Sequence, residues 1–470
     1  MHQARRKLLH FTKYTFPAYK AEPFHELVAA TLDGVVAGEI HRLMLFAPPQ
    51  HGKTELVSIR LPAFFLGKRP DEPVILTSYA ASLALRNSRH TRRTLNSAQY
   101  KRLFPDVCIN PRSRSVEHWE IDGKRGGLVA AGVGGPITGF GAKLAIIDDP
   151  FKNFEQAQSE TYREMVWEWW RTTFRPRVWE DGAIVLIMTR WHKDDLAGRL
   201  LKQQADQWTI LRLPAIAETQ KERDTNDKLL GLPIGQSDPL GRDPEEPLSP
   251  ERYGLGTLLE LQRDIGSYAW AAEYQGSPQP MEGNLAKRHW FEIVDQAPRA
   301  VKARVRAWDF AATEKKAGKA DPDYTVGTRM SVLQGIYYVE DVIRERVGPG
   351  AVERLARQTA DIDGKKVRIR LEQEPGASGK LFVATMIKVL DGWNVGAEPS
   401  TGDKIIRAMP FLAQAEAGNV RLVRGAWNEE WLGEMCSVPH APHDDQWDSA
   451  AAAYEELQEE KPRGGVKRYA

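Results

Sequence analysis

The chain has 470 residues, which is more than one hydrophobic core usually supports, so we expect two or three domains. Hydrophobic residues make up 42% and charged residues 27%, as in soluble globular proteins, and no apolar run approaches the roughly eighteen residues of a membrane helix. Because 65 basic residues balance 63 acidic ones, for a formal charge of +2, any nucleic-acid surface has to be a local patch.

Two further features of the composition narrow the class of protein. The only cysteines, Cys108 and Cys436, are far apart, which argues against a disulfide scaffold or a structural zinc site. The basic residues 1–7 are followed by further charged residues and not by the apolar core of a signal peptide. We therefore expect a cytoplasmic protein without a membrane segment.

The first half of the chain alternates short apolar runs with amphipathic stretches. Runs bounded by Gly, Pro or Asp, which predict buried parallel strands, occur at residues 43–47, 74–79, 144–147 and 183–189. Amphipathic stretches at 80–95 and 159–174 predict helices between these strands. This alternation indicates a doubly wound α/β domain that ends near residue 217.

A phosphate-binding motif lies directly after the first predicted strand. Residues 47–54 match G-x-x-x-x-G-K-[ST], except that Ala47 replaces the first Gly. In a P-loop the backbone N–H groups cradle the phosphates of ATP, Lys53 would neutralise the β and γ oxygens, and the Thr54 hydroxyl would hold Mg²⁺. The expected nucleotide-binding residues of this loop are Gln50, His51, Gly52, Lys53 and Thr54.

Two acids and a threonine extend the nucleotide site. The apolar run 144–147 ends in Asp148 and Asp149, as a Walker B strand does, so we expect Asp148 to anchor Mg²⁺ and Asp149 to polarise the attacking water. Thr189 follows the next apolar strand, where motor ATPases place a residue that senses the nucleotide. Arg190 and His192, beside it, fit ordinary ion-pair and capping roles equally well.

A polar stretch separates the two halves. Residues 218–250 are rich in Pro, Gly and Asp, which predicts a linker or mobile loop that cannot pack alone. A helix is expected at 249–273, and a proline-rich turn at 276–283 ends the connection. The connecting segment as a whole is expected to cover residues 218–295.

A second α/β unit is expected at residues 296–460. Strands are predicted at 305–310, 324–331, 335–342, 367–371 and 393–397, and helices at 351–360, 380–390, 404–417 and 445–457. Three consecutive strands, then alternating helices and strands, then a closing helix is the order of a ribonuclease-H-like nuclease. Residues 461–470 read as a basic tail.

Acidic residues stand at the ends of these predicted strands and at the start of the last helix. Asp309 ends the first strand, Glu372 ends the fourth, and Asp444 and Asp445 open the closing helix. Two Mg²⁺ or Mn²⁺ ions held by three or four carboxylates can activate water and stabilise the leaving oxygen of a phosphodiester. These acids therefore predict a two-metal nuclease site.

Neighbouring acids compete for these roles. Glu374 competes with Glu372, because residues two apart on a strand lie on the same face. Asp448 competes with Asp445, because one helical turn aligns Asp448 with Asp444.

The roles of a nearby histidine and three cations also stay open. His443 could ligate a metal ion but fits packing or capping better. Lys380, Lys404 and Arg407 could contact DNA phosphates or belong to solvated helix faces.

The motifs of the two halves together resemble the large subunit of tailed-phage terminases, over nearly the whole chain. The resemblance rests on residues 48–54, 139–142, 147–150, 189–195, 308–313, 323–325, 372–376 and 443–448. One departure is Phe140, where relatives often carry an Arg in a Gly-rich loop. The arginine finger is therefore not placed by that loop, and Arg86, Arg125 and Arg190 remain as candidates.

The resemblance implies an α/β protein with an ASCE-type P-loop NTPase domain, which has a parallel sheet, at residues 1–217, followed by a ribonuclease-H-like nuclease domain at 296–460. It also implies ATP-driven translocation of double-stranded viral DNA into a procapsid and metal-dependent endonucleolytic cutting of concatemeric DNA in the host-cell cytoplasm. By the same resemblance, the nuclease ligands are Asp309, Glu372 and Asp444, with Asp445 and Asp448 as supports.

The partners implied by the resemblance are a portal protein, a small terminase subunit and further copies of the chain. The copies would form a ring of about five on the portal and could be monomers when free. The basic tail, Lys461 to Arg468, is a candidate portal contact.

Two other functions fit parts of the sequence. A repair helicase–nuclease would carry a second helicase domain with a Gln-x-x-Gly-Arg-x-x-Arg motif, and none lies between the two halves. A nucleotide-dependent DNA-binding assembly factor would keep both folds but would have lost ATP hydrolysis and DNA cleavage. The presence of Lys53, Thr54, Asp148 and the full set of nuclease acids argues against such decay.

Overall fold

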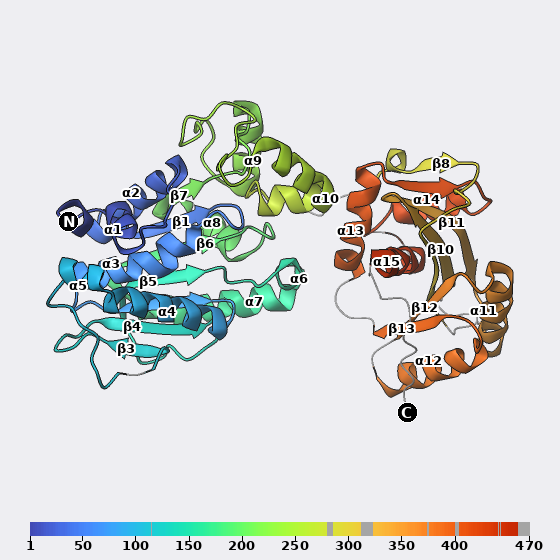
Figure 1. The fold of residues 1–470 in the computed structure, drawn as a ribbon, viewed down its shortest axis with the longest axis horizontal. Helices are drawn as coiled ribbons and strands as arrows, with labels where there is room; N and C mark the ends of the chain where they lie inside the picture. The colour runs from blue at the N-terminus through green and yellow to red at the C-terminus, as the bar shows by residue number, and fades with distance from the viewer. Residues whose placement is uncertain are drawn as a thin grey trace. The chain divides into compact units, whose positions relative to one another are not determined.

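The computed structural model describes residues 1–113, 115–279, 285–311, 323–373, 376–399, 404–439, 441 and 443–458. The chain divides into two compact units, each built on one seven-stranded sheet (Figure 1). The first unit comprises Met1–Glu260 and Tyr268–Pro280, and the second Leu261–Ser267 and Met281–Ala470. Among the described residues, no helix combines the length and apolar character that crossing a membrane requires.

The sheet of the first unit has the order β3–β4–β2–β5–β6–β1–β7. Its strands are β1 (Arg42–Phe46), β2 (Val74–Ser78), β3 (His118–Glu120), β4 (Gly127–Gly132), β5 (Ala142–Asp148), β6 (Val178–Met188) and β7 (Thr209–Arg212). Only β3, at one edge, is antiparallel to its neighbour. The four strands expected from the sequence are confirmed as β1, β2, β5 and β6. The others are short or rich in Gly and Ala, so their apolar signal is weak.

Helices cover both faces of this sheet. They are α1 (Leu8–Thr15), α2 (Pro23–Ala37), α3 (Leu61–Lys68), α4 (Ala81–Asn96), α5 (Ala98–Leu103), α6 (Phe154–Gln158), α7 (Glu160–Trp169), α8 (Leu196–Gln204) and α9 (Gln220–Leu230). Side chains alternate along β1, so Leu43 and Leu45 enter one apolar layer while Met44 and Phe46 enter the other. The predicted helices at 80–95 and 159–174 are confirmed as α4 and α7, the latter continuing into a π-helical turn at Trp170–Phe174.

The polar stretch 218–250 contains structure that its composition did not predict. Helix α9 begins with a capping box, in which the Thr219 hydroxyl accepts from the Glu222 N–H and the Glu222 carboxylate accepts from the Thr219 N–H. The expected linker or mobile loop is thus partly helical and ordered by local hydrogen bonds.

Buried ion pairs attach this helix to the sheet. Arg212, at the end of β7, donates from Nη2 to Glu218 Oε2 at 2.6 Å and from Nε to Asp227 Oδ1 at 2.9 Å. All three side chains are at most 4% exposed. The composition of this stretch shows only that it has few apolar residues, so it did not predict packing through buried ion pairs.

We expect Arg212→Met to lower the free energy of unfolding of the first unit by about 3–5 kcal/mol, because two carboxylates would stay buried without their cation. The matched control is Arg171→Met, which removes an exposed pair with Glu168 and should cost about 0–1 kcal/mol. Urea denaturation of the full chain measures both. Equal losses in the two variants would contradict a structural role for the buried network.

The sheet of the second unit has the order β13–β12–β9–β10–β11–β14–β8. Its strands are β8 (Glu292–Val294), β9 (Ala303–Asp309), β10 (Thr325–Leu333), β11 (Ile336–Glu345), β12 (Arg368–Gln373), β13 (Val395–Pro399) and β14 (Val420–Val423). Its helices are α11 (Pro349–Asp363), α12 (Ala377–Val389), α13 (Lys404–Glu416), α14 (Asn428–Met435) and α15 (Asp445–Gln458). Helix α10 (Leu255–Glu273), interrupted at Gly266, has residues in both units.

The five strands and four helices expected in the second half are confirmed. Strands β9, β10 and β11 are antiparallel, and β12 is parallel to β9 and β13. Short β8, β14 and α14 were not predicted. Glu374 and the tail at 461–470 lie outside the described residues.

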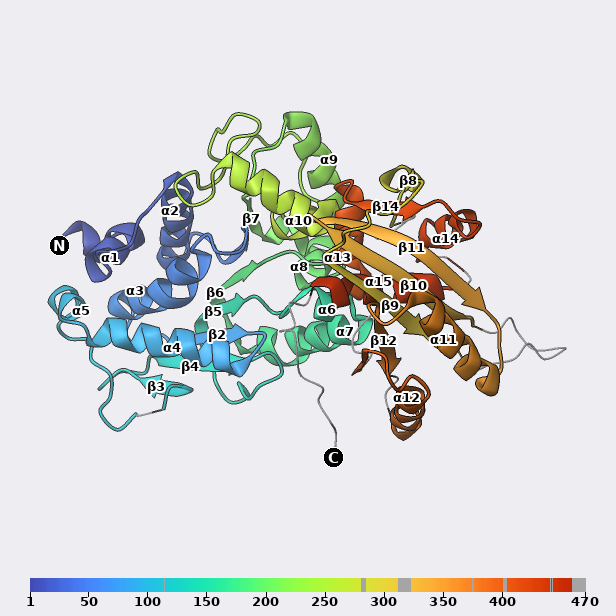
Figure 2. The same cartoon turned by 45° about the vertical axis from the view of Figure 1, so that its right-hand side comes forward.

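Helix α15 lies against the sheet at β9 and β10 (Figure 2). The Ser449 hydroxyl donates to Ala307 O at 3.0 Å and accepts from the Thr328 N–H at 2.9 Å, which fixes the helix on the two strands. The first turn of α15, with its acids, is therefore held over the end of β9.

Candidate active sites

Residues 47–52 form a loop between β1 and a helix that begins at Lys53 and is π-helical over Glu55–Arg60. Gln50 has φ 60° and Gly52 has φ 82°, both in the left-handed region. Left-handed residues within a turn point successive backbone N–H groups toward one side, which is how backbone nests bind anions. A Cβ at position 52 would also lie 3.0 Å from His25 Nε2. The loop backbone therefore suits a phosphate, and Gly52 is required for both its conformation and its space.

The ammonium group of Lys53 is buried beside this loop. Its Nζ donates to Ala47 O at 3.2 Å and to Thr189 Oγ1 at 2.7 Å, and it lies 3.7 Å from Asp149 Oδ1. These residues follow β1, β6 and β5, which are neighbours in the sheet, so their carboxyl ends meet. The structure thus brings together three of the residues expected from separate motifs. Thr54, half-buried, directly precedes the π-helical turn.

Asp148 is buried at the end of β5, where Asn87 of α4 donates from Nδ2 to its Oδ2 at 3.1 Å. Burial first, and the charge of Asp149 second, raise the pKa of Asp148 to about 7. A carboxyl in these surroundings is stabilised in its charged form by a nearby cation. Asp148 therefore fits a Mg²⁺ ligand.

Asp149 is held in one orientation beside Lys53. Its backbone has φ 47°, and its Oδ1 accepts from the Thr189 N–H at 2.8 Å. The side chain is 26% exposed, so a carboxylate oxygen can be reached from solvent. This is an arrangement that can orient a water molecule.

Residues that the sequence analysis did not single out support the loop. Arg252 donates from Nη1 to Gln50 O at 3.3 Å, and the Tyr253 ring stacks on His51 at 5.1 Å. His25 donates from Nε2 to His51 O at 3.0 Å. Arg252 and Tyr253 lie about two hundred residues from the loop in sequence, and no motif spacing marks them.

His25 is neutral in this arrangement, since its Nδ1 accepts from the Glu22 N–H at 3.0 Å while Nε2 donates. Burial first, and the charge of Arg252 second, lower the pKa of His25 to about 4. An unfolded His titrates near 6.5, so the unfolded chain binds this proton first and folding stability falls as pH drops from about 6.5 to 4.

We expect the melting temperature of the first unit to fall over that pH interval and His25→Gln to make the fall shallower. Replacing the exposed His10 by Gln serves as the control and should leave the slope unchanged. Differential scanning fluorimetry between pH 8 and pH 4 measures it. A slope for His25→Gln equal to that of the wild type would contradict the buried neutral imidazole.

The three candidate arginine fingers lie in different surroundings. Arg190 is 1% exposed and donates from Nε to Asp195 Oδ2 at 2.8 Å, so its guanidinium forms an internal ion pair. Arg125 is exposed on the loop before β4. Arg86 is exposed on α4, and its charge partly offsets the rise in the pKa of Asp148 that burial and Asp149 cause.

In the second unit, Asp309 and Glu372 meet at one edge of the sheet. Strands β9 and β12 are parallel neighbours, with Trp308 opposite Leu371, so the acids that follow are adjacent. Burial first, and then the charges of Glu372, Asp448 and Asp445, raise the pKa of Asp309 well above its usual range. The strands thus place a charged cluster where the sequence predicted a metal site.

The closing helix contributes three acids with different surroundings. Asp448 is 2% exposed and shares a cation with Glu372, because Arg407 donates to Asp448 Oδ1 at 3.1 Å and to Glu372 Oε1 at 3.0 Å. Asp444 is half-exposed and reaches the cluster through Lys404. The structure therefore brings Asp309, Glu372 and Asp448 together more closely than the expected set with Asp444. Helical spacing had marked Asp448 only as a competitor.

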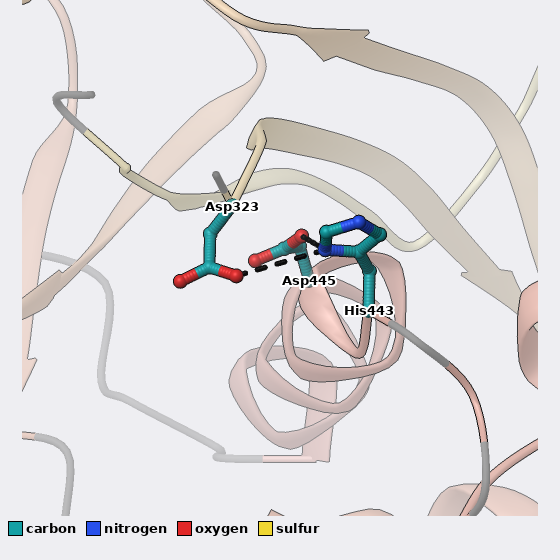
Figure 3. A group of neighbouring side chains, drawn as sticks. All are labelled: Asp323, His443 and Asp445. Atoms are coloured by element: carbon teal, nitrogen blue, oxygen red, sulfur yellow. Dashed lines mark ion pairs between the residues drawn. The ribbon is translucent and has the colours of Figure 1, made fainter. Parts of the chain in front are cut away.

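Asp445 also belongs to a second group of side chains, with Asp323 and His443 (Figure 3). Its Oδ2 accepts from the Tyr324 N–H at 3.1 Å and lies 3.9 Å from His443 Nδ1, which is 3.6 Å from Asp323 Oδ1. Arg346 lies 3.3 Å from His443 Nε2. An arginine only donates, so Nε2 accepts and the neutral ring carries its proton on Nδ1. The ligand atoms of Asp323, His443 and Asp445 all lie within 4.8 Å of one another, close enough to hold one metal ion.

The donor set of the cluster formed by Asp309, Glu372 and Asp448 fits hard divalent cations. Carboxylate oxygens are the ligands that Mg²⁺ and Mn²⁺ prefer. Glu372 Oε2 is buried and has no hydrogen-bond partner among the residues that the structure describes. Besides burial, the neighbouring carboxylates raise the pKa of Asp309, because they repel its charged form. A divalent cation bound among these carboxylates would remove that repulsion.

Two family models match the chain. The N-terminal part of the T4likevirus-type terminase large subunit matches residues 44–293, and the terminase RNaseH-like domain matches residues 306–457. No curated protein matches.

Solved structures of the large terminase from a thermophilic bacteriophage are similar. Its crystal form 2 is 11% identical with a TM-score of 0.50, covering 95% of this chain and 98% of that one. Its crystal form 3 is 12% identical at 0.49, covering 95% and 98%, and the ADP complex in that form is 12% identical at 0.49, covering 93% and 96%. The expected fold class, a P-loop ATPase fold followed by a ribonuclease-H-like fold, is confirmed.

Proposed function

Because the chain belongs to the family of phage terminase large subunits, we propose that it couples ATP hydrolysis to translocation of double-stranded viral DNA into a procapsid and cuts concatemeric DNA with a metal-dependent nuclease. One observation supports the proposal most directly. Each unit gathers its own set of charged groups at the strand ends of its own sheet, with Lys53 and Asp149 in the first and Asp309 and Glu372 in the second.

In the first unit, the P-loop residues would bind the triphosphate. The backbone N–H groups of Gln50, His51 and Gly52 would bind phosphate oxygens, and Lys53 would turn from Thr189 toward them. Mg²⁺, when bound, supplies positive charge that stabilises the transferring phosphoryl group.

The remaining polar groups of this site have separate roles in the proposal. Thr54 and Asp148 would hold the ion, and Asp149 would orient the attacking water. Thr189 contacts both Lys53 and Asp149, so it would report the state of the nucleotide to β6.

In the second unit, Asp309 and Glu372 would be metal ligands, and Asp448 would be the third carboxylate. Asp444 and Asp445, at the rim of the cluster, would complete or position the ligand set. Two divalent ions, when bound, activate water and stabilise the leaving oxygen of a DNA strand. The chain's own contribution is to keep these carboxylates together at one sheet edge.

The organisation and partners follow the family. The ATPase domain would be residues 1–217, the connection 218–295 and the nuclease domain 296–460, working in the host-cell cytoplasm on a portal-bound ring of about five copies with a small terminase subunit. The basic tail at 461–470 would contact the portal. Deleting these residues and finding unchanged portal binding would remove that part of the proposal.

The test of the proposed function is to measure ATP hydrolysis by the purified protein with and without duplex DNA, and DNA cleavage with Mg²⁺ and with Mn²⁺. We expect DNA to stimulate hydrolysis and either metal to support cleavage. A protein that binds ATP and DNA but turns over neither would instead be an assembly factor.

A further inference from the structure

Two cations of α13 lie inside the proposed nuclease cluster, and we propose that they make its metal binding depend on DNA. Lys404 and Arg407 would compete with divalent ions for the carboxylates until DNA phosphates draw these cations away. The inference rests on the proposed nuclease function and adds to it a control of when the metal site can fill.

Both oxygens of Asp448 are already engaged by these cations. Arg407 Nη2 donates to Oδ1 at 3.1 Å, and Lys404 Nζ lies 2.6 Å from Oδ2. Asp448 is 2% exposed, so solvent does not screen these contacts as it would on the surface. A metal ion at either oxygen of Asp448 would lie beside one of these cations, and the like charges would weaken its binding.

The same cations engage two more acids. Arg407 Nη1 donates to Glu372 Oε1 at 3.0 Å, and Lys404 Nζ lies 3.0 Å from Asp444 Oδ1. The two cations therefore offset the negative charge that would otherwise attract a divalent ion.

The backbone of α13 presents the pair as a unit. Lys404 and Arg407 are three residues apart and share one helix face. Lys404 O accepts from Trp447 Nε1 of α15 at 3.3 Å, and Phe411 of α13 is fully buried in the core of this unit. Release of the acids can thus come from side-chain movement while the helix stays in place.

DNA supplies the competing acceptors. Lysine and arginine pair with phosphate oxygens as readily as with carboxylates, and Lys404 is 48% exposed, so a phosphate can reach it. When the cations turn to phosphates, the carboxylates regain their full charge for the metal. By linkage, DNA then tightens metal binding and metal tightens DNA binding by the same factor.

A purely structural role makes a different prediction. If the cations only held the carboxylates together, replacing them would lower stability without tightening metal binding. If they only contacted DNA, replacing them would weaken DNA binding without changing metal affinity. Competition predicts opposite changes in the two affinities within one variant.

The test uses the full chain and the variants Lys404→Gln and Arg407→Gln. Electron paramagnetic resonance of free Mn²⁺, without DNA, gives the metal affinity. Fluorescence anisotropy of a labelled duplex of about 20 base pairs, in EDTA, gives metal-free DNA affinity. Lys404→Gln is the main variant, because this half-exposed side chain can be replaced without disturbing the core. Lys388→Gln, at an exposed position on α12, is the control for net charge.

We expect each α13 variant to bind Mn²⁺ about five- to tenfold more tightly than the wild type and DNA about three- to tenfold more weakly. The control should change neither. Unchanged Mn²⁺ affinity in both α13 variants would overturn the inference. Asp309→Asn distinguishes failure of this inference from failure of the proposed metal site. A wild type that binds no more Mn²⁺ than Asp309→Asn would refute the metal site itself.

Discussion

Replacing Lys53 with alanine is expected to lower the rate of ATP hydrolysis by about 10²–10³-fold and leave DNA cleavage intact. Lys53 is the buried cation of the P-loop, and its Nζ lies within 3.7 Å of both Thr189 Oγ1 and Asp149 Oδ1. Without it, the developing charge on the phosphoryl oxygens loses its nearest fixed cation. A phosphate-release assay at saturating ATP measures the loss.

The control for this variant is Lys152→Ala, which removes an exposed lysine from the loop that follows β5. Its hydrolysis rate should stay close to that of the wild type. Thermal melting shows whether both variants are folded. A folded Lys53→Ala variant with undiminished hydrolysis would show that the loop is not the nucleotide site.

Asp309→Asn is expected to lower DNA cleavage by about 10²–10³-fold while ATP hydrolysis stays at the wild-type level. It should also raise the melting temperature of the second unit in EDTA. Burial and neighbouring carboxylates raise the pKa of Asp309 well above its usual range, so its charged form is unfavourable in the folded metal-free protein. An amide of the same shape removes that repulsion.

The control for this second variant is Asp391→Asn, at an exposed position after α12. It makes the same chemical change and should alter neither cleavage nor melting temperature. The combination of greater stability and lost activity is expected only where a charge is kept for function. Cleavage by Asp309→Asn at the wild-type rate would remove this residue from the proposed metal ligands.

The sequence predicted which side chains come together where local geometry decides their position. Lys53 and Gly52 follow from a loop whose spacing is set by the backbone. Asp148 and Glu372 each follow from a strand whose carboxyl end lies beside those of its parallel neighbours, β5 in the first sheet and β12 in the second. In these cases one element, or two neighbouring strands, is enough to place the side chain.

The sequence was less informative where a contact joins distant elements. Helical spacing named Asp448 as a competitor, but the packing of α13 on α15 brings Lys404 and Arg407 to it. Arg252 and Tyr253 reach the P-loop from a turn just before α10, where the sequence predicted the start of a helix. Such contacts depend on tertiary packing, which cannot be inferred from the period of the hydrophobic pattern or from composition.

We propose that one chain carries two separate catalytic sites, one for ATP hydrolysis and one for DNA cleavage. The most direct measurement follows ATP hydrolysis and the cutting of supercoiled plasmid in the same tubes, with Mg²⁺ or Mn²⁺, for the wild type, Lys53→Ala and Asp309→Asn. We predict that the wild type performs both reactions, that Lys53→Ala loses hydrolysis alone, and that Asp309→Asn loses cutting alone. A wild type that neither hydrolyses ATP nor cuts DNA with either metal would contradict the account and leave a DNA-binding assembly factor in its place.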